Sequence, residues 1–182
     1  MDILTLLHAC GPAVHPTTTI ALIRAESGGN PYAIDDDTSR RVYLPQSKSQ
    51  AEKIATRLLQ AGHRIDMGLT QISSPWLSAW HVTLPQVFTP CSNIRLGTLL
   101  LASNYQHCLA DGRTTKAALW CALSRYNTGT ATGGYAYIYR VLSQVHAQAE
   151  LGHWASPTTA PQLDPYGGLI FPSTASAGVV TR

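Results

Sequence analysis

The stretch ALIRAESGGNP, residues 21–31, is mostly apolar but carries a single carboxylate, Glu26, shortly before two glycines. Upstream, Pro16 and three threonines suit a helix start, because proline has no N–H to leave unpaired and a threonine hydroxyl caps free backbone amides. The glycines and the Asn-Pro pair after them are strong helix breakers. The sequence therefore predicts a helix over residues 16–27, with Glu26 in its last turn.

The surroundings of Glu26 decide what its carboxyl can do. Apolar or small residues face nearly every direction of the helix, with Arg24 as the main exception, which is typical of a buried helix. Burial and the negative end of the helix dipole both disfavour the ionised carboxyl and raise its pKa. A protonated carboxyl beside an open cleft is what a general acid requires. Helix physics alone favours a plainer interpretation, an exposed Glu26 paired with Arg24 or a lysine.

The composition indicates one globular domain with a core. The 182 residues are 45% hydrophobic and 13% charged, with a formal charge of +3. No apolar run is long enough to span a membrane, and the scattered basic residues argue against nucleic-acid binding. The seven histidines lack metal-binding spacing, and neither a phosphate-binding loop nor a GxSxG motif is present. We therefore expect a monomer with no metal and no cofactor.

Hydrophobic periodicity predicts an α+β fold that is mainly α, with a small β-hairpin or sheet. The clearest helix covers residues 49–61, where Ser49 and Glu52 have capping-box spacing and Gly62 ends the run. Strands are expected over residues 40–44 and 63–72, paired with each other. Further helices are predicted over residues 4–9, 92–109, 117–123 and 137–149, with Thr114 or Thr115 capping the third of these.

The two ends of the chain differ from the domain between them. After Trp154 the composition changes to Pro, Ser, Thr, Ala and Gly, so we expect a domain over residues 1–155 and a flexible tail over residues 156–182. Residues 1–7 lack the basic segment of a signal peptide, and none is visible.

Cysteines and aspartates allow several interpretations. The cysteines are too far apart for a CxxC metal pair, and their even number permits two disulfides in three connectivities, or four buried thiols: Cys10, Cys91, Cys108 and Cys121. Asp35, Asp36 and Asp37 lack the spacing of a calcium loop and are expected in a solvated loop. Asp66 is expected to belong to the hairpin.

Four segments resemble the motifs of family 1 lytic transglycosylases. ESGGNPYAI, which begins at Glu26, resembles the catalytic motif of that family. The second motif, the third motif and the final tyrosine segment are matched by GLTQI at 68–72, ALSRYNTG at 122–129 and GYAYI at 134–138. The segments follow the order of the family, and the resemblance covers roughly residues 10–145.

Finer features resemble the VirB1-like branch of this family, the peptidoglycan-cutting subunits of type IV secretion and conjugative pilus systems. These features are CGPAV at 10–14, the segment over residues 49–72 and TPCSNI at 89–94. Because the first and last contain Cys10 and Cys91, the resemblance implies a Cys10–Cys91 disulfide and, by remainder, a Cys108–Cys121 disulfide. A disulfide-bonded chain fits the bacterial periplasm that the family implies.

The resemblance implies a lysozyme-like fold and cleavage of the MurNAc-GlcNAc β-1,4 bond of peptidoglycan. In this family the C6 hydroxyl of the same MurNAc attacks in place of water and leaves a 1,6-anhydro end. One carboxylate then suffices where most glycosidases use two. The implied role of Glu26 is to protonate the leaving oxygen and then to take the proton of the C6 hydroxyl.

Similarity assigns substrate-binding roles to the first two motifs. Ser27 is expected either beside the reacting sugar or bonded to the backbone at the helix end. Gly68 is expected to let the sugar approach closely or to make a bend, and Gln71 to present its amide to the glycan. Thr70 stands where the family often has methionine, which leaves the shape of the nearby subsite open.

The third and fourth motifs supply the remaining expected contacts. Tyr126 and Asn127 are expected beside Glu26, with Tyr126 orienting the carboxyl. Tyr137 matches the cleft tyrosine of the family better than Tyr135 does, because an isoleucine follows it.

Two other functions remain open from the sequence. A second carboxylate from the Asp35–Asp37 run or from Asp66 would favour a hydrolase of the goose-type lysozyme kind. A wall-binding assembly module is the other alternative, although an intact Glu26 argues against pure binding. The expected partners are peptidoglycan strands and, through residues 156–182, components of a secretion or pilus machine.

Overall fold

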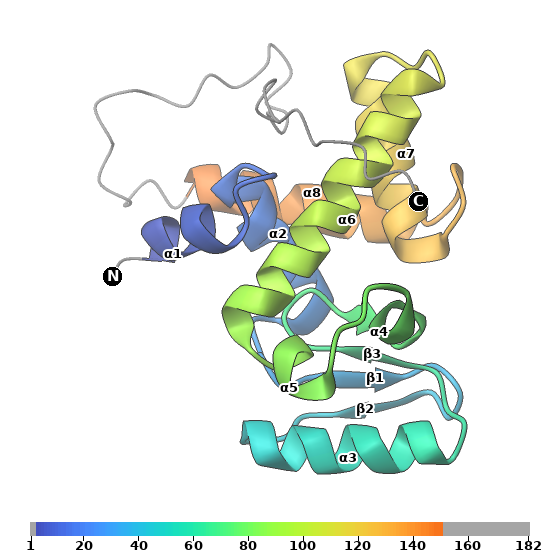
Figure 1. Ribbon diagram of the computed structural model, residues 1–182. Helices are drawn as coiled ribbons and strands as arrows, with labels where there is room; N and C mark the ends of the chain where they lie inside the picture. Colours follow the sequence, from blue (N-terminus) through green and yellow to red (C-terminus); the bar gives the residue numbers. More distant parts are fainter. Residues whose placement is uncertain (1–2, 151–182) are drawn as a thin grey trace.

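The computed structural model describes residues 3–150, and helices dominate it (Figure 1). The larger part contains α1 (Ile3–Cys10), α2 (Pro16–Ser27), α6 (Pro90–Ala110), α7 (Thr115–Thr128) and α8 (Tyr135–Glu150). The smaller part contains β1 (Ile34–Asp36), β2 (Arg41–Tyr43), α3 (Lys48–Gln60), β3 (Ile65–Met67), β4 (Ile72–Ser73), α4 (Pro75–Ala79) and α5 (Leu84–Val87). This mainly helical α+β architecture confirms the predicted fold class.

Each part has its own apolar core. Leu22 of α2 packs with Leu101 of α6 and Leu123 of α7 in the helical part. In the smaller part, α3 covers one face of the sheet, and Ala51 and Ala55 pack against Ile34 and Ile65. The long helix α6 passes from the sheet to α7 and so belongs to both parts (Figure 1).

Helix starts follow capping chemistry, though not always at the predicted residue. Thr114 caps α7 as predicted, because its hydroxyl accepts the Ala117 amide. The cap of α3 is Ser47, so the predicted Ser49–Glu52 capping box is wrong. The cap of α2 is His15, whose ring nitrogen accepts the Thr17 amide, whereas a threonine was predicted. Several polar side chains near each start suit a cap, and the local backbone decides among them.

The antiparallel sheet has the order β2-β1-β3-β4 and corrects two predictions. Residues 40–44 and 63–72 do not pair with each other, because β1 lies between β2 and β3. The Asp35–Asp37 run is not simply a solvated loop, since Asp35 and Asp36 lie in β1. Asp36 is fully buried, with hydrogen bonds from Ser39 and His63. Such partners make a buried carboxylate tolerable, and sequence periodicity does not reveal them.

A tight turn divides the predicted strand 63–72 into β3 and β4. Gly68 has a φ of +80°, which favours glycine, and a Cβ there would come within 2.9 Å of Asn93 Cγ. The buried Asn93 side chain donates to the Met67 and Val87 carbonyls and accepts from the Thr70 amide. Asn93 therefore holds the turn from inside, and the glycine makes room for it.

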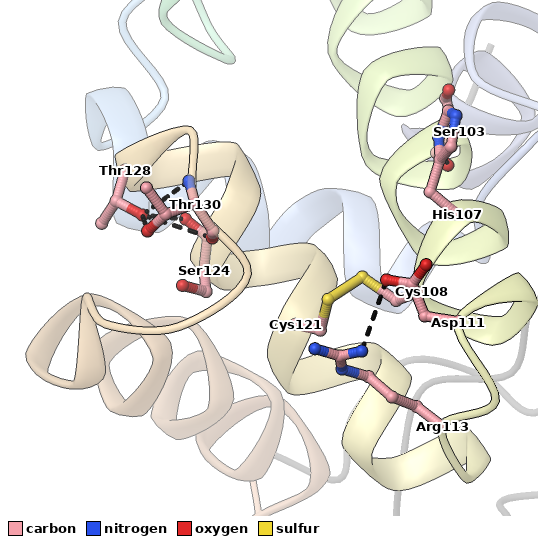
Figure 2. Close-up of a disulfide and its surroundings, with 9 residues drawn as sticks. All are labelled: Ser103, His107, Cys108, Asp111, Arg113, Cys121, Ser124, Thr128 and Thr130. Carbon is pink, nitrogen blue, oxygen red and sulfur yellow. Dashed lines mark hydrogen bonds and ion pairs between the residues drawn. A yellow bond between two sulfur atoms is a disulfide. The ribbon is translucent and has the colours of Figure 1, made fainter.

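Two disulfides link the helices, with the connectivity that the resemblance implied. Cys10–Cys91 joins α1 to the first turn of α6. Cys108–Cys121 joins the last turns of α6 to α7, across the turn that contains Asp111 (Figure 2). Both pairs tie α6, the helix common to the two parts, to its neighbours.

The described residues end before the predicted domain boundary. Residues 151–155 of the predicted domain and the predicted tail, 156–182, lie outside them. Within residues 3–150, none of the helices combines the length and hydropathy of a membrane span.

The disulfides generate a stability prediction. Replacing Cys10 and Cys91 by alanine should cost more than replacing Cys108 and Cys121, because the cysteines are 81 residues apart in the first pair and 13 in the second. Chain entropy predicts losses of about 4.5 and about 3 kcal/mol in the free energy of unfolding. Urea titrations of the oxidised variants measure both, and the reverse order would contradict the prediction.

The turn between β3 and β4 generates a second prediction. Gly68→Ala should destabilise the protein more than Gly112→Ala, since both glycines have a φ near +80° but only Gly68 has neighbours where the Cβ would go. Backbone strain alone costs about 1–2 kcal/mol, and overpacking adds about 1–3 kcal/mol. Urea titration of both variants compares them, and equal losses would show that Asn93 moves aside freely.

Candidate active site

Glu26 lies in the last turn of α2, as predicted. Buried Ala21 and Leu22 anchor the helix in the core. Gly28 ends it in the left-handed conformation, and its amide donates to the Arg24 carbonyl at 3.2 Å. This anchored helix end places the Glu26 carboxyl in the wall of a groove.

A tyrosine from the far end of the domain holds the carboxyl. The Tyr137 hydroxyl, in the first turn of α8, donates to Glu26 Oε1 at 2.6 Å. The Tyr126 hydroxyl instead donates to the Thr70 carbonyl at 2.7 Å. The sequence favoured Tyr137 over Tyr135 as the cleft tyrosine, and the contact of Tyr137 with Glu26 agrees with that choice, while Tyr135 is largely exposed. The prediction that Tyr126 orients the carboxyl is wrong, because the end of α7 faces the turn at Thr70.

The pKa of Glu26 suits a general acid. Burial raises it, while the hydrogen bond from Tyr137 and the charge of Arg140 partly oppose the rise. Asp66 and Asp35 raise it further, and the result is a pKa of about 7. A large fraction of the carboxyl therefore keeps its proton at neutral pH.

The groove beside Glu26 has a volume of about 1060 Å³. One side is the sheet, and the others include α4, α6 and the end of α7. Trp76 and Trp80 line it as a stacked pair with ring centroids 4.4 Å apart. Polar and charged side chains also line it, among them Asp35, Asp37, Arg64, Asp66, Gln71, Arg125, Asn127 and Arg140. Aromatic faces beside hydrogen-bonding groups are a suitable surface for a sugar chain.

Asp35 and Asp66 bring carboxyl groups to the groove, where sequence reasoning favoured a solvated loop and a hairpin role and left a second carboxylate as the alternative. They are direct cross-strand partners on β1 and β3, and both line the groove. Burial raises the pKa of Asp66 to about 6, and burial together with neighbouring aspartates raises the pKa of Asp35. The alternation IDM at residues 65–67 was the available signal, since Ile65 and Met67 are buried on the opposite face.

The remaining residues of the second motif contact protein atoms. The Gln71 side-chain nitrogen donates to the Gly68 carbonyl at 2.8 Å and the Ala33 carbonyl at 3.3 Å, while the residue lines the groove. The group that lies close to Gly68 is the Asn93 side chain of the protein itself. Thr70 is fully buried against Asn93. The threonine that stands where the family often has methionine therefore faces the core. Asn93 is a supporting residue that sequence reasoning missed.

Ser27 and Asn127 have different surroundings. The Ser27 hydroxyl donates to the Leu69 carbonyl at 2.8 Å and the Ile23 carbonyl at 3.2 Å, which agrees with the helix-end alternative. Asn127 is exposed and lines the groove, as a glycan contact requires. In the described part of the chain, no group of three or more His, Cys, Asp or Glu side chains is arranged to hold a metal ion.

Comparisons with known proteins identify the family. The model of the family described as the transglycosylase SLT domain matches residues 6–140. Type IV secretion system protein virB1 of Brucella abortus biovar 1 (strain 9-941) is 34% identical over 133 residues, which are 72% of this chain and 56% of that protein. Protein virB1 of Agrobacterium fabrum (strain C58) is 35% identical over 133 residues, 71% of this chain and 53% of that protein. No solved structure matches.

These matches confirm the resemblance on which the site was predicted. The chain spans little more than half the length of the virB1 proteins that it matches. The matched segment contains Glu26, Gln71, Tyr126 and Tyr137, the residues that the fold brings to one groove or its wall. Since the family model covers most of the chain, this protein belongs to the transglycosylase SLT domain family, within its VirB1-like branch.

Proposed function

We propose that the protein is a peptidoglycan lytic transglycosylase that cleaves the MurNAc-GlcNAc β-1,4 bond and leaves 1,6-anhydroMurNAc ends. The observation that carries this proposal is the Glu26 carboxyl, which has a pKa of about 7 and lies in the wall of a groove that can hold a glycan strand. Membership of the SLT domain family supports a role in degrading peptidoglycan.

In the proposed reaction Glu26 transfers one proton in each direction. The protonated carboxyl gives its proton to the glycosidic oxygen, and the bond between that oxygen and the MurNAc C1 breaks. The acetamido group of the same sugar stabilises the positive charge at C1. The Glu26 carboxylate then takes the proton of the C6 hydroxyl while that oxygen bonds to C1. Glu26 regains its proton, so no second carboxylate and no water are consumed.

Tyr137 and Arg140 assist the carboxyl through both steps. The hydrogen bond from Tyr137 occupies Oε1, which leaves Oε2 to exchange the proton with the sugar. Arg140 lies with its guanidinium carbon 5.5 Å from the centre of the Tyr137 ring. Its charge stabilises the carboxylate that exists between the two proton transfers.

A lysozyme-type hydrolase is the second candidate, because Asp35 and Asp66 face the same groove. In a hydrolase, one of these carboxylates would activate a water molecule or stabilise the sugar cation. A wall-binding module without catalysis is less well supported, because binding alone does not call for a raised pKa at Glu26.

We place this activity in the bacterial periplasm, where it would open the wall locally for a type IV secretion or conjugative pilus machine. The printed name of the Brucella relative supports the machine, and the two disulfides suit an oxidising compartment. Residues 156–182 are the proposed contact with machine components.

Product analysis tests the proposed reaction. Wild-type protein incubated with purified peptidoglycan should release muropeptides with 1,6-anhydro ends, and Glu26→Gln should lower the rate by at least about a thousandfold because the amide cannot donate the proton. Mass spectrometry separates these products from the reducing ends of a hydrolase by the mass of one water.

Asp66→Asn is the matched variant for that experiment. It should retain anhydro products, since water activation is not part of the proposed reaction. Reducing ends from the wild type that disappear in Asp66→Asn would overturn the transglycosylase proposal and support the hydrolase. Wall binding without any product would support the binding module.

The pH dependence tests the role of Tyr137. Because the acid form of Glu26 is active, kcat/KM should fall about tenfold per pH unit above its pKa of about 7. The Tyr137 hydrogen bond stabilises the carboxylate, so Tyr137→Phe should lower the rate and move the alkaline limb to higher pH. Tyr43→Phe, on the edge strand β2, is the control that should leave the profile in place. A limb unchanged by Tyr137→Phe would contradict the assignment.

A further inference from the structure

A second cavity, of about 430 Å³, lies between α7 and the start of α8. Its walls come from the turn between α6 and α7, one side of α7 and the loop that leads into α8. The side chains that matter below are Arg113, Lys116, Trp120, Ser124, Tyr135 and Ile138. None of the residues lining this cavity lines the groove at Glu26.

Trp120 and Tyr135 bring aromatic rings to the lining of the cavity, and Tyr139 packs beside Trp120 outside that lining. Trp120 lies edge-on to Tyr139, with ring centroids 5.4 Å apart, and 6.5 Å from the ring of Tyr135. Tyr135 and Tyr139 are 59% and 62% exposed, among the most exposed large side chains of the described residues. Contiguous exposed apolar patches can mark binding surfaces, and tyrosine and tryptophan are enriched at such surfaces.

The charge of the cavity is opposite to that of the sheet side of the groove. Its charged lining residues are Arg113 and Lys116, both cationic, and no acidic residue lines it. The Arg113 guanidinium also pairs with Asp111, with 3.4 Å between Nη1 and Oδ2, which leaves its other N–H groups for a ligand (Figure 2). The groove contains arginines as well, but acidic side chains outnumber them there: Glu26, Asp35, Asp37 and Asp66 against Arg64, Arg125 and Arg140. A ligand with free carboxylates is therefore better matched to this cavity, where guanidinium and ammonium groups form charge-assisted hydrogen bonds.

One polar group in the lining lacks a partner within the protein. Ser124 is 1% exposed, and among the described residues its hydroxyl has no hydrogen-bond partner. Ser124 lies one turn after Cys121 on α7. The Cys108–Cys121 disulfide ties this part of α7 to α6, and Arg113 lies beside the disulfide (Figure 2). A buried hydroxyl without a partner costs free energy, which a ligand carbonyl or amide would offset.

The cavity and the groove share their structural supports. Tyr137 faces Glu26, while Tyr135 and Ile138 of the same helical turn line the cavity. Thr128 and Gly129 line the groove, and the residues that follow them in the same loop line the cavity: Ala131, Thr132 and Gly133. The loop over residues 128–133 therefore contributes to both the groove and the cavity, and we expect a branch of a ligand in the groove to pass over it to the cavity.

We infer that this cavity binds the peptide stem of peptidoglycan, a short peptide that carries free carboxylates and methyl side chains. Arg113 and Lys116 hold the carboxylates, the apolar and aromatic walls contact the methyl groups, and Ser124 bonds to a peptide group. The inference rests on the proposed function, which makes peptidoglycan the substrate. It extends recognition from the sugar chain to the peptide branches.

The test measures binding directly, without turnover. The full chain is titrated with the tetrapeptide that an amidase releases from purified peptidoglycan, and the indole N–H resonance of Trp120 is followed by NMR. Lys116→Glu should raise Kd about tenfold, the effect of losing one charge-assisted contact. Lys53→Glu makes the same charge change on exposed α3 and should leave Kd unchanged. A peptide with amidated carboxylates should bind about tenfold more weakly.

Three outcomes would overturn the inference: no shift at Trp120, equal weakening by Lys116→Glu and Lys53→Glu, or shifts at Trp76 and Trp80 alone, which would place the peptide in the groove. Failure of the inference is distinct from failure of the proposed function. The released peptide contains no glycosidic bond, and cleavage is judged by the product masses of Glu26 variants.

Discussion

The hydrogen bond between the Tyr137 hydroxyl and the Glu26 carboxyl depends on almost every other part of the structure. It joins residues 111 positions apart, one at the end of α2 and one at the start of α8. Burial raises the pKa of the carboxyl, and the hydrogen bond keeps the rise moderate. The balance leaves a group near pH 7 that can both give and take a proton, whereas a fully solvated glutamate would be ionised there.

The two parts of the protein make different contributions to that balance. The helical part buries α2 and brings α8 against it, which positions the two partners. The sheet contributes negative charge, because alternation places Asp35 and Asp66 on the groove face while Ile34, Asp36 and Ile65 are buried on the other. Asp36 is compatible with burial because Ser39 and His63 bond to it. One run of three aspartates thus divides between core and groove.

The disulfides and Asn93 supply rigidity rather than chemistry. Both disulfides end on α6, and Asn93 of α6 holds the turn that carries Thr70 and Gln71. The Thr70 carbonyl in turn accepts the Tyr126 hydroxyl. The groove is therefore bounded by elements that are fixed to one helix, which is the preorganisation that proton transfer in a defined geometry requires.

The sequence by itself determined the class of the fold, the helix that ends at Glu26 and, through four motifs in order, the family. Its cysteines left three disulfide connectivities open, and the resemblance to the VirB1-like branch implied the pairing that the structure shows. These features depend on local patterns, such as an apolar run followed by glycines, and on similarity over a long segment. The tertiary structure decided which tyrosine holds the carboxyl, that β1 lies between β2 and β3, and that Asp66 faces the groove. The stretches that contain β2 and β3 were predicted as strands, but β1 was not, because its three residues carry too little periodicity. The partner of a buried hydroxyl or carboxyl depends on how distant segments pack, which no local pattern records.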